Sequence, residues 1–325
     1  MTWQSTLTWK NAQKRAKILQ QIRQFFSKRN VVEVETPALS QGTVTDVYLD
    51  TLTCKYDFLV DSPAGHSTEL FLQTSPEFHM KRLLASGYGC IFQITKAFRH
   101  EESGKNHNPE FTMLEWYRIG FDQFDLMFEV ADLLQVVLGG NKALFTSYQD
   151  IFIETVAVDP LIANFDQFVE VLAKHDKCAD WLVEQNDPDA LLQFIFTEII
   201  EPTIGIIQPQ FIYDFPIAQA SLAKRSTDDP RVAQRFECYY RGIELVNGFN
   251  ELTDANEQVL RFEEDNVKRS AQGLLVKPID GNFIAALKHG LPQCSGVALG
   301  IDRLVMLALD ITNIREVQSF SIERA

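Results

Sequence analysis

Two stretches of alternating side chains, joined by a short polar segment, constrain the fold of this chain most strongly. In residues 91–99 apolar and polar side chains alternate, and in residues 111–118 the residues Phe111, Glu115 and Tyr117 fall on one face of a strand. The letters EESGKNHNP between them are too polar and too rich in turn formers to continue either strand. The pattern therefore predicts an antiparallel hairpin.

Helical and strand-like patterns surround this hairpin. Residues 11–29 carry apolar side chains at helical spacing, whereas residues 31–36 alternate and end at Pro37. Residues 121–200 have a mainly helical pattern, and a strand-like segment returns at 239–249. No internal repeat or low-complexity linker divides the chain.

The composition excludes several classes of protein. Lys and Arg number 30 and Asp and Glu 44, so the net charge of −14 argues against a phosphate-neutralising surface. The five cysteines are far apart and form no zinc or disulfide pattern, and we interpret most of them as core thiols. The sequence shows neither a signal peptide nor an apolar run of membrane-spanning length. We therefore expect a cytoplasmic protein without membrane contact.

An arginine stands where the predicted hairpin turns. Arg99 precedes the polar loop, and Phe111 begins the returning strand. A guanidinium beside an aromatic ring suits the binding of a phosphate with a base stacked nearby. On spacing alone, a surface hairpin with an ordinary ion pair is the more economical interpretation.

Three glutamates recur at a spacing of seven residues, namely Glu237, Glu244 and Glu251. In a strand, an odd spacing places successive carboxylates on opposite faces unless a bulge or turn intervenes, and Asn247-Gly248 offers such a turn. Converging carboxylates would suit Mg²⁺ on a nucleotide, because this hard cation takes few carboxylates and keeps its waters. The alternative is that they are solvated strand residues.

A glycine-containing segment, GVALGIDRL at 296–304, leads into a helix expected at 299–309. Gly300 would let a ligand approach the backbone, and Arg303 in the first helical turn could point at a phosphate. Taken alone, a tight turn into a core helix is the better interpretation of this segment.

Together, these segments resemble the class II aminoacyl-tRNA synthetases. Pro37 after an amphipathic helix is similar to motif 1, FRHE with HNPEFTMLEWY to motif 2, and GIDRL to motif 3. TSPEFHMKRLL at 74–84 and ELVNGFNEL at 244–252 resemble the lysyl branch. The resemblance covers nearly the whole chain. It implies an α+β fold, the class II synthetase catalytic domain, with a mostly antiparallel β-sheet flanked by helices.

The resemblance also implies how the chain is organised. We expect one catalytic domain over residues 1–325 with a mainly helical segment around 121–200. Because the motif 1 helix begins near residue 11, we expect no anticodon-binding OB domain and no anticodon recognition. The chain resembles the truncated paralogues of the lysyl branch, whose acceptor is elongation factor P. Motif 1 forms a dimer interface in this class, which implies a homodimer.

An ATP site follows from the same resemblance. Arg99 would hold the α-phosphate and the substrate carboxylate, and Arg303 would take the γ-phosphate, which makes these two the catalytic candidates. Phe111 would stack on adenine. Glu237 and Glu244 would carry Mg²⁺. The other ATP-binding candidates are His100, Glu101, His107, Asn108, Glu244, Leu245 and Gly300.

A substrate with two ammonium groups, (R)-β-lysine or lysine, needs compensating acceptors. Ser75 and Glu77 would meet the amine nearer the carboxylate, and Glu251 and Tyr117 the distal one. The remaining substrate-binding candidates are Pro76, Glu115, Asn247 and Ala298. For Glu77 and Glu115, an ordinary salt bridge is the alternative.

The side chain of Ala298 bears on substrate choice. The synthetase usually has glycine at this position, and an added methyl group can reshape a small pocket, which favours a β-amino acid. The implied reaction is ATP-dependent formation of a β-lysyl adenylate and transfer to the ε-amine of a lysine of elongation factor P. The alternatives are a tRNA-charging enzyme and a non-catalytic regulator. The presence of Arg99, Glu101, Glu244 and Arg303 argues against the regulator.

Overall fold

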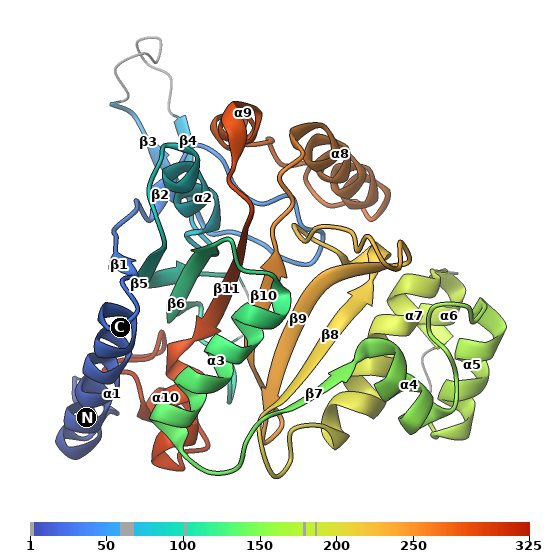
Figure 1. Cartoon of the computed structure of the whole chain (residues 1–325), viewed down its shortest axis with the longest axis horizontal. Helices are drawn as coiled ribbons and strands as arrows, with labels where there is room; N and C mark the ends of the chain where they lie inside the picture. Colours follow the sequence, from blue (N-terminus) through green and yellow to red (C-terminus); the bar gives the residue numbers. More distant parts are fainter. Residues whose placement is uncertain (1–2, 59–67, 101–102, 178–179, 186) are drawn as a thin grey trace. The chain divides into compact units, whose positions relative to one another are not determined.

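The described residues of the computed structural model, 3–58, 68–100, 103–177, 180–185 and 187–325, form two compact units (Figure 1). The terminal unit comprises Met1–Phe121, Val136–Leu138 and Thr253–Ala325, and the central unit Asp122–Gln135 and Gly139–Leu252. Within the described ranges, no helix is both long enough and apolar enough to cross a bilayer.

The sheet of the terminal unit contains the predicted hairpin. Its strands are, in spatial order, β1 (Val32–Glu33), β5 (Ile91–Phe98), β6 (Glu110–Ile119) and β11 (Cys294–Gly300). β1 pairs with β5 in parallel, whereas β5 with β6 and β6 with β11 are antiparallel. A small antiparallel sheet of β2 (Leu39–Ser40), β4 (Thr68–Leu72) and β3 (Thr53–Tyr56) lies in the same unit. The predicted antiparallel hairpin is confirmed.

Helices complete the terminal unit. They are α1 (Trp9–Ser27), α2 (Glu77–Ala85), α8 (Ala255–Ala271), α9 (Gly281–Gly290), α10 (Ile301–Leu309) and a short 3₁₀ turn at Ile314–Glu316. The helix predicted at 11–29 begins two residues earlier, because the hydroxyl of Thr8 accepts a hydrogen bond from the Asn11 N–H and caps it. The strand predicted at 31–36 is reduced to the two residues of β1.

Helix α1 covers one face of the β5–β6 hairpin. The ring of Phe26 stacks on Phe92 at 4.4 Å between centroids and meets the edge of Trp116 at 5.2 Å. Because side chains alternate along a strand, this packing leaves Gln93 and Glu115, which are paired across β5 and β6, on the opposite face. One face of the hairpin therefore serves the core and the other is available for chemistry.

A buried aspartate joins four segments of the terminal unit. Asp302, in the first turn of α10, forms an ion pair with Arg15 of α1 at 2.7 Å. It also accepts hydrogen bonds from the Thr112 N–H of β6 at 2.8 Å and from the Gln318 side chain at 2.9 Å. Only 1% of Asp302 is exposed. The start of α10 is thus held by charge as well as by packing.

The central unit has its own sheet and a helical cap. In spatial order its strands are β10 (Ile243–Asn250), β9 (Val232–Tyr240), β8 (Gln210–Pro216) and β7 (Leu144–Ser147), antiparallel except for β7 with β8. Its helices are α3 (Gln123–Leu138), of which Gln123–Gln135 belongs here, α4 (Tyr148–Val156), α5 (Phe165–Lys174), α6 (Asp180–Gln185), α7 (Pro188–Ile195), the π-helix Phe196–Ile200 and the 3₁₀ turns Glu201–Thr203 and Ile217–Gln219.

The strand-like segment predicted at 239–249 is divided between two strands, β9 and β10. Arg241 and Gly242 both have positive φ angles, 52° and 71°, which is the geometry of a two-residue hairpin turn. The chain therefore reverses between Tyr240 and Ile243, and the segment forms the end of β9 and most of β10. An alternating pattern cannot reveal such a reversal when the residues on both sides of the turn remain β-formers.

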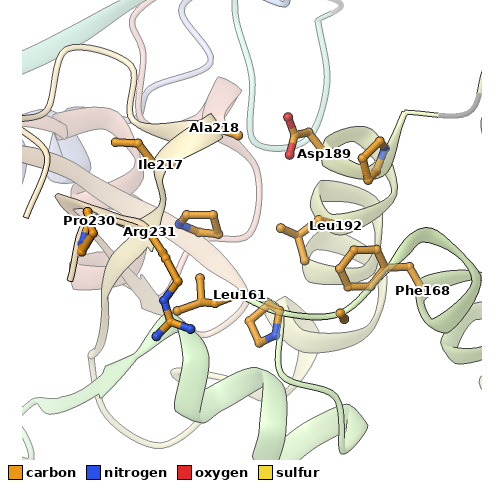
Figure 2. A pocket seen from close by; sticks show the side chains of 12 residues that line it. Leu161, Phe168, Asp189, Leu192, Ile217, Ala218, Pro230 and Arg231 are labelled. Atoms are coloured by element: carbon orange, nitrogen blue, oxygen red, sulfur yellow. The ribbon is translucent and has the colours of Figure 1, made fainter.

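A cavity of about 460 Å³ lies between the helices of the central unit and the end of β8. Figure 2 shows Leu161, Phe168 and Leu192 on one side and Ile217 and Ala218 on another, with the Arg231 side chain nearby. Its walls are mostly apolar.

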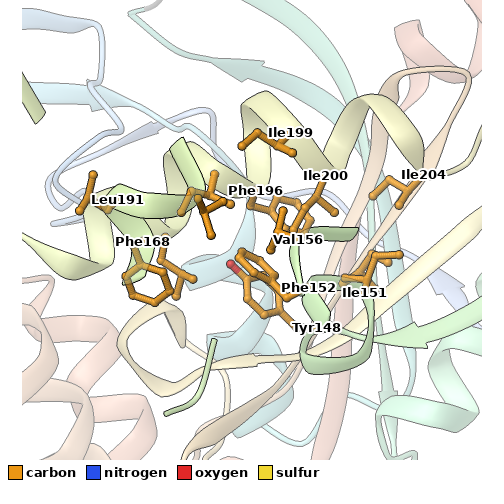
Figure 3. Packing of buried hydrophobic residues seen from close by; sticks show 14 of the residues in the cluster. Tyr148, Ile151, Phe152, Val156, Phe168, Leu191, Phe196, Ile199, Ile200 and Ile204 are labelled. Atoms are coloured by element: carbon orange, nitrogen blue, oxygen red, sulfur yellow. The ribbon is translucent and has the colours of Figure 1, made fainter. Parts of the chain in front are cut away.

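Aromatic rings form the core of the central unit (Figure 3). Tyr148 stacks on Phe152 at 4.8 Å and on Phe196 at 5.1 Å, and Phe196 in turn meets Phe215 of β8 at 5.9 Å. The helices α4, α5 and α7 and the π-helix all contribute side chains to this cluster. Burial of these rings holds the helical cap on its sheet.

The Asp302 network predicts a large stability effect. Asp302→Ala would leave the buried Nη1 of Arg15 and the Thr112 N–H without the carboxylate that they meet, so the free energy of unfolding should fall by about 3–5 kcal/mol. Urea unfolding followed by fluorescence measures the change. Lys96→Ala, which removes the exposed ion pair with Glu110, is the control and should change it by less than about 1 kcal/mol. Equal effects of the two substitutions would contradict the assignment.

Candidate functional site

The hairpin loop brings a guanidinium next to an aromatic ring. Arg99 lies 5.2 Å above the centroid of the Phe111 ring, measured from its guanidinium carbon. The backbone N–H of Arg99 donates to the carbonyl of Pro109 at 2.9 Å, which continues the pairing of β5 and β6 by one step. Arg99 is half-buried, and this hydrogen bond fixes its backbone at the end of the sheet. The two residues for which a phosphate contact and an adenine contact are predicted therefore lie next to each other.

The second arginine lies against the same loop. The Nη2 atom of Arg303 is 2.8 Å from Nε2 of His107, and its Nε donates to the carbonyl of Asn106 at 3.4 Å. Arg303 projects from the first turn of α10, whose start is held by Asp302. The loop between β5 and β6 therefore has Arg99 at its beginning and Arg303 at its centre.

The other nucleotide candidates of the terminal unit differ in their surroundings. The amide of Asn108 donates to the carbonyl of Glu110 at 2.6 Å and accepts from the Ile322 N–H at 3.0 Å, so it shapes the loop. His100 is exposed, and its N–H donates to the carbonyl of Asp50 at 3.0 Å. Glu101 lies outside the described residues.

The glycine at the start of α10 is not required by the protein's own packing. Gly300 has a φ angle of −73°, and a Cβ added there would meet the Arg303 side chain at 3.6 Å, an ordinary contact. A methyl group would nevertheless reduce the space beside Arg303. A ligand close to the backbone therefore remains a reason for glycine at this position.

A buried cluster of polar groups surrounds Glu115 of β6. Its carboxylate accepts hydrogen bonds from the hydroxyls of Tyr117 at 2.7 Å and Ser75 at 2.9 Å. The Ser75 hydroxyl also accepts from the Glu77 N–H at 2.9 Å, at the beginning of α2. Glu77 forms an ion pair with Lys81 at 2.6 Å. The residues predicted for the two ammonium groups of the substrate, Ser75 with Glu77 and Tyr117 with Glu115, are thus one connected cluster.

Small residues face this cluster from the neighbouring strand. In the register of β6 with β11, Tyr117 lies opposite Gly296 and Glu115 opposite Ala298. Cross-strand partners share a face and stand close together, so the methyl group of Ala298 borders the Glu115 carboxyl group. Pro76, which lies between Ser75 and Glu77 and precedes α2, is buried.

Burial governs the charge of this cluster. Burial, and after it the neighbouring charge of Glu77, raise the pKa of Glu115 to about 8, although the hydrogen bonds from Tyr117 and Ser75 and the charge of Lys81 act to lower it. Only 2% of Glu115 is exposed. At neutral pH this raised pKa favours the protonated form of Glu115.

The glutamates of the central unit lie on two adjacent strands. Glu237 of β9 is opposite Asn247 of β10, and Glu244 of β10 is opposite Tyr239. A register shift between Glu244 and Val246 puts Leu245 into a bulge, so Glu244 and Asn247 face the same side despite their odd spacing. The bulge at Leu245 and the turn at Arg241-Gly242 thus bring these residues onto one face. The predicted turn at Asn247-Gly248 is wrong, because both residues lie within β10.

Glu237 has protein partners of its own. Arg235 pairs with it at 2.5 Å, and the hydroxyl of Tyr239 donates to its other oxygen. Glu244 is half-buried, Leu245 is buried, and Glu251 is buried at a bridge with Ala223. No group of three or more potential metal-ligating side chains occurs within the described ranges of the chain.

Comparison with known proteins agrees with this geometry. The model of the class II tRNA synthetases (D, K and N) matches residues 2–324. The chain belongs to this family. A protein of Pectobacterium atrosepticum named elongation factor P (R)-β-lysine ligase is 53% identical over 324 residues, which is 100% of this chain and 98% of the relative. Proteins with the same name from Salmonella typhi and Klebsiella pneumoniae are 53% and 54% identical, again over 100% of this chain and 98% of each relative.

The segment that resembles motif 1 forms α1 and β1 and ends at Pro37, the one that resembles motif 2 forms the β5–β6 hairpin, and GIDRL, which resembles motif 3, lies at the junction of β11 and α10. The predicted fold class is confirmed. The cavity of Figure 2 contains none of the predicted site residues. Of the four cysteines described, Cys238 and Cys294 are buried, whereas Cys54 is exposed and Cys90 half-buried, so the expectation of mostly core thiols holds for two.

Sequence reasoning missed three partners of the predicted residues. Lys81 neutralises Glu77, Arg235 neutralises Glu237, and Asp302 holds the start of α10. The first two carried a signal, because Lys81 follows Glu77 at the i,i+4 spacing of a helix and Arg235 precedes Glu237 by two residues on one face of a strand. Asp302 carried none, since its partners are distant in sequence.

The raised pKa of Glu115 predicts a pH dependence of stability. Because the pKa in the folded protein, about 8, exceeds the unfolded value near ~4.3, the stability that protonated Glu115 contributes is fully present below ~4.3 and is lost as the pH rises through about 8. Glu115→Gln is neutral throughout and should flatten the decline in melting temperature between pH 5 and 8. The exposed glutamate of the same strand provides the control, since Glu110→Gln should keep the wild-type slope. Parallel curves for wild type and Glu115→Gln would contradict the assignment.

Proposed function

We propose that this protein activates (R)-β-lysine with ATP and transfers it to the ε-amine of a lysine of elongation factor P. The observation that carries the proposal is the full-length match, at 53–54% identity, to relatives that bear the name of this ligase. The arrangement of Arg99, Phe111 and Arg303 around one loop supports the nucleotide half of the reaction.

In the first step, an oxygen of the substrate carboxylate attacks the α-phosphorus of ATP. A P–O bond to the carboxylate forms, the bond to the β-phosphate breaks, and pyrophosphate leaves. No general base is needed, because a carboxylate with a pKa near ~4 is already ionised at neutral pH. Catalysis then rests on alignment and on stabilising the charge that grows on the phosphoryl oxygens. Arg99 would bind the α-phosphate and the carboxylate, and Arg303 the γ-phosphate.

The remaining nucleotide contacts belong to the same proposal. Phe111 would stack on the adenine ring, since it lies beside Arg99 at the end of the loop. His107 lies against Arg303 and would reach the phosphates with it. Glu101 and His100 would bind the nucleotide where the loop begins, and Asn108 would act by holding the loop in shape.

A magnesium ion would neutralise phosphate charge in this reaction. Mg²⁺ commonly takes only one or two carboxylates together with phosphate oxygens and water, so the pair Glu237 and Glu244 on one face of β9 and β10 is chemically sufficient. Glu244 fits better, because Glu237 already has the cation Arg235 beside it. Glu237 would contribute through lone pairs that remain on its oxygens.

The substrate's two ammonium groups would be received by buried oxygens. Glu115, Tyr117 and Ser75 form a connected acceptor set in the terminal unit. Glu251 and Asn247 of the central unit are the further acceptors that we propose for the distal amine. Glu77 already pairs with Lys81, so the salt bridge considered for it is present before any substrate binds.

In the second step, the acceptor lysine attacks the adenylate carbonyl. A C–N bond forms, the bond to AMP breaks, and the amine loses a proton as AMP leaves. The unperturbed pKa of such an amine is ~10.4, so desolvation at the docking surface must favour its neutral form.

We also propose that the protein acts in the cytoplasm as a homodimer, since the class II family uses motif 1 as its dimer interface and exposed Trp9 and Val32 lie on that segment.

The reaction can be tested directly. Intact-mass spectrometry of elongation factor P incubated with the protein, ATP and (R)-β-lysine should show a gain of one β-lysyl group on one lysine. Arg99→Ala and Arg303→Ala should each lower kcat of pyrophosphate exchange by about 10²–10³, because each removes a charge donor to the transition state. Lys105→Ala, an exposed cation of the same loop, should retain wild-type exchange. Charging of tRNA with no modification of elongation factor P would sink the proposal.

The choice of isomer is expected to depend on Ala298. Its methyl group borders Glu115 across the β6–β11 register, so Ala298→Gly enlarges the space beside the acceptor cluster. The ratio of kcat/KM for (R)-β-lysine over lysine should fall by about 10-fold or more, equivalent to ~1–3 kcal/mol per methylene-sized change. Pyrophosphate exchange with each isomer measures it. An unchanged ratio would remove Ala298 from the explanation of specificity.

A further inference from the structure

The acceptor cluster of the terminal unit contains two carboxyl groups, of which Glu115 is buried and Glu77 half-buried, and one cation. Lys81 is 1% exposed and lies 2.6 Å from Oε1 of Glu77, so these two charges neutralise each other. The ammonium group of Lys81 also lies 5.8 Å from the centroid of the Phe283 ring on α9, which encloses it further. The pair therefore carries no net charge.

Glu115 is left with neutral neighbours. Its hydrogen-bond donors are the hydroxyls of Ser75 and Tyr117. Across the strands it faces Gln93 on β5 and Ala298 on β11, neither of which is charged. Within the described part of the terminal unit, the charged groups that act on Glu115 are Glu77 and Lys81 of α2, which already pair with each other.

An ionised carboxylate at this place would carry a high desolvation cost. Hydroxyl donors offset part of that cost, but a buried charge without a counter-charge is strongly unfavourable. A proton removes the cost in the ligand-free protein, and a bound ammonium group would remove it equally well. The two states have the same net charge at this position, so one can replace the other.

We infer that binding of the diamino acid exchanges a proton on Glu115 for a substrate ammonium group, while Lys81 keeps Glu77 neutralised and out of the exchange. The inference rests on the proposed function and extends it. The proton leaves the Glu115 carboxyl group for solvent, and the substrate ammonium group keeps all its own protons. Lys81 is in this sense a positioning residue, because it decides which of the two carboxyl groups receives the substrate.

Proton exchange has a thermodynamic signature. If one proton leaves on binding, the dissociation constant of the diamino acid falls about tenfold for each unit by which the pH rises, as long as the pH is below the pKa of Glu115. Above that pKa the dissociation constant no longer changes with pH. If Glu115 were already ionised in the ligand-free protein, the substrate would bind with a dissociation constant that does not depend on pH in this way. Since burial raises the pKa of Glu115 to about 8, the effect falls within an accessible pH range.

Titration calorimetry tests the exchange. The full-length protein is titrated with (R)-β-lysine or lysine at pH 6.5 in buffers of different ionisation enthalpy, and the slope of the observed heat against that enthalpy counts the protons released. Wild type should release about one. Tyr117→Phe, which keeps the carboxyl group and removes only a hydrogen-bond donor, should also release about one, whereas Glu115→Gln should release none.

The outcomes separate the inference from the function on which it rests. Binding by wild type without proton release, or an undiminished release by Glu115→Gln, would overturn the exchange and leave the proposed substrate standing. Absence of any binding heat for either diamino acid would count against the substrate and remove the inference with it. Should Glu115→Gln fail to fold, the wild-type count between pH 6.5 and 8.5 decides, because release must decline as the pH passes about 8.

Discussion

The geometry of the nucleotide half depends on the buried charge of Asp302. This carboxylate ties α10 to α1 through Arg15, to β6 through the Thr112 N–H and to the C-terminal segment through Gln318. Arg303 is the next residue, so the direction in which its guanidinium leaves the helix follows from this anchor. The charge of a long, flexible side chain has a defined direction only when the backbone that carries it is fixed. The direction of the Arg303 side chain therefore depends on the buried carboxylate of the residue before it.

Carboxylates in both units are accompanied by cations, but to different degrees. Glu77 has Lys81 and Glu237 has Arg235, each within 2.6 Å or less. Glu115 has hydroxyl donors only, together with small or neutral neighbours across the strands. Because an uncompensated buried charge is costly, Glu77 and Glu237 are stabilised as carboxylates by their cations, whereas burial raises the pKa of Glu115.

Much of the site was predictable from local pattern. Alternation in 91–99 and 111–118 predicted the hairpin, and the same alternation placed Glu115 and Tyr117 on the face away from Phe26. The alternation of apolar and polar residues failed to predict the structure where a turn or a one-residue bulge changes the side of the sheet on which the following side chains lie. The turn at Arg241-Gly242 and the bulge at Leu245 move Glu244 onto the side of Glu237, and neither leaves a clear mark in the order of apolar and polar residues.

By itself, the sequence determined the family, the order of the motifs and the identity of the arginines and glutamates, because residue types and their local spacing carry that information. Only the tertiary structure decided that Asp302 pairs with Arg15 and that Glu115 is buried beside the hydroxyl groups of Ser75 and Tyr117. Arg15 and Asp302 are far apart in the chain, and whether Glu115 is protonated depends on the strands and helix that exclude water from it. Charge state is set by desolvation and by neighbours in space, and neither is a property of spacing along the chain.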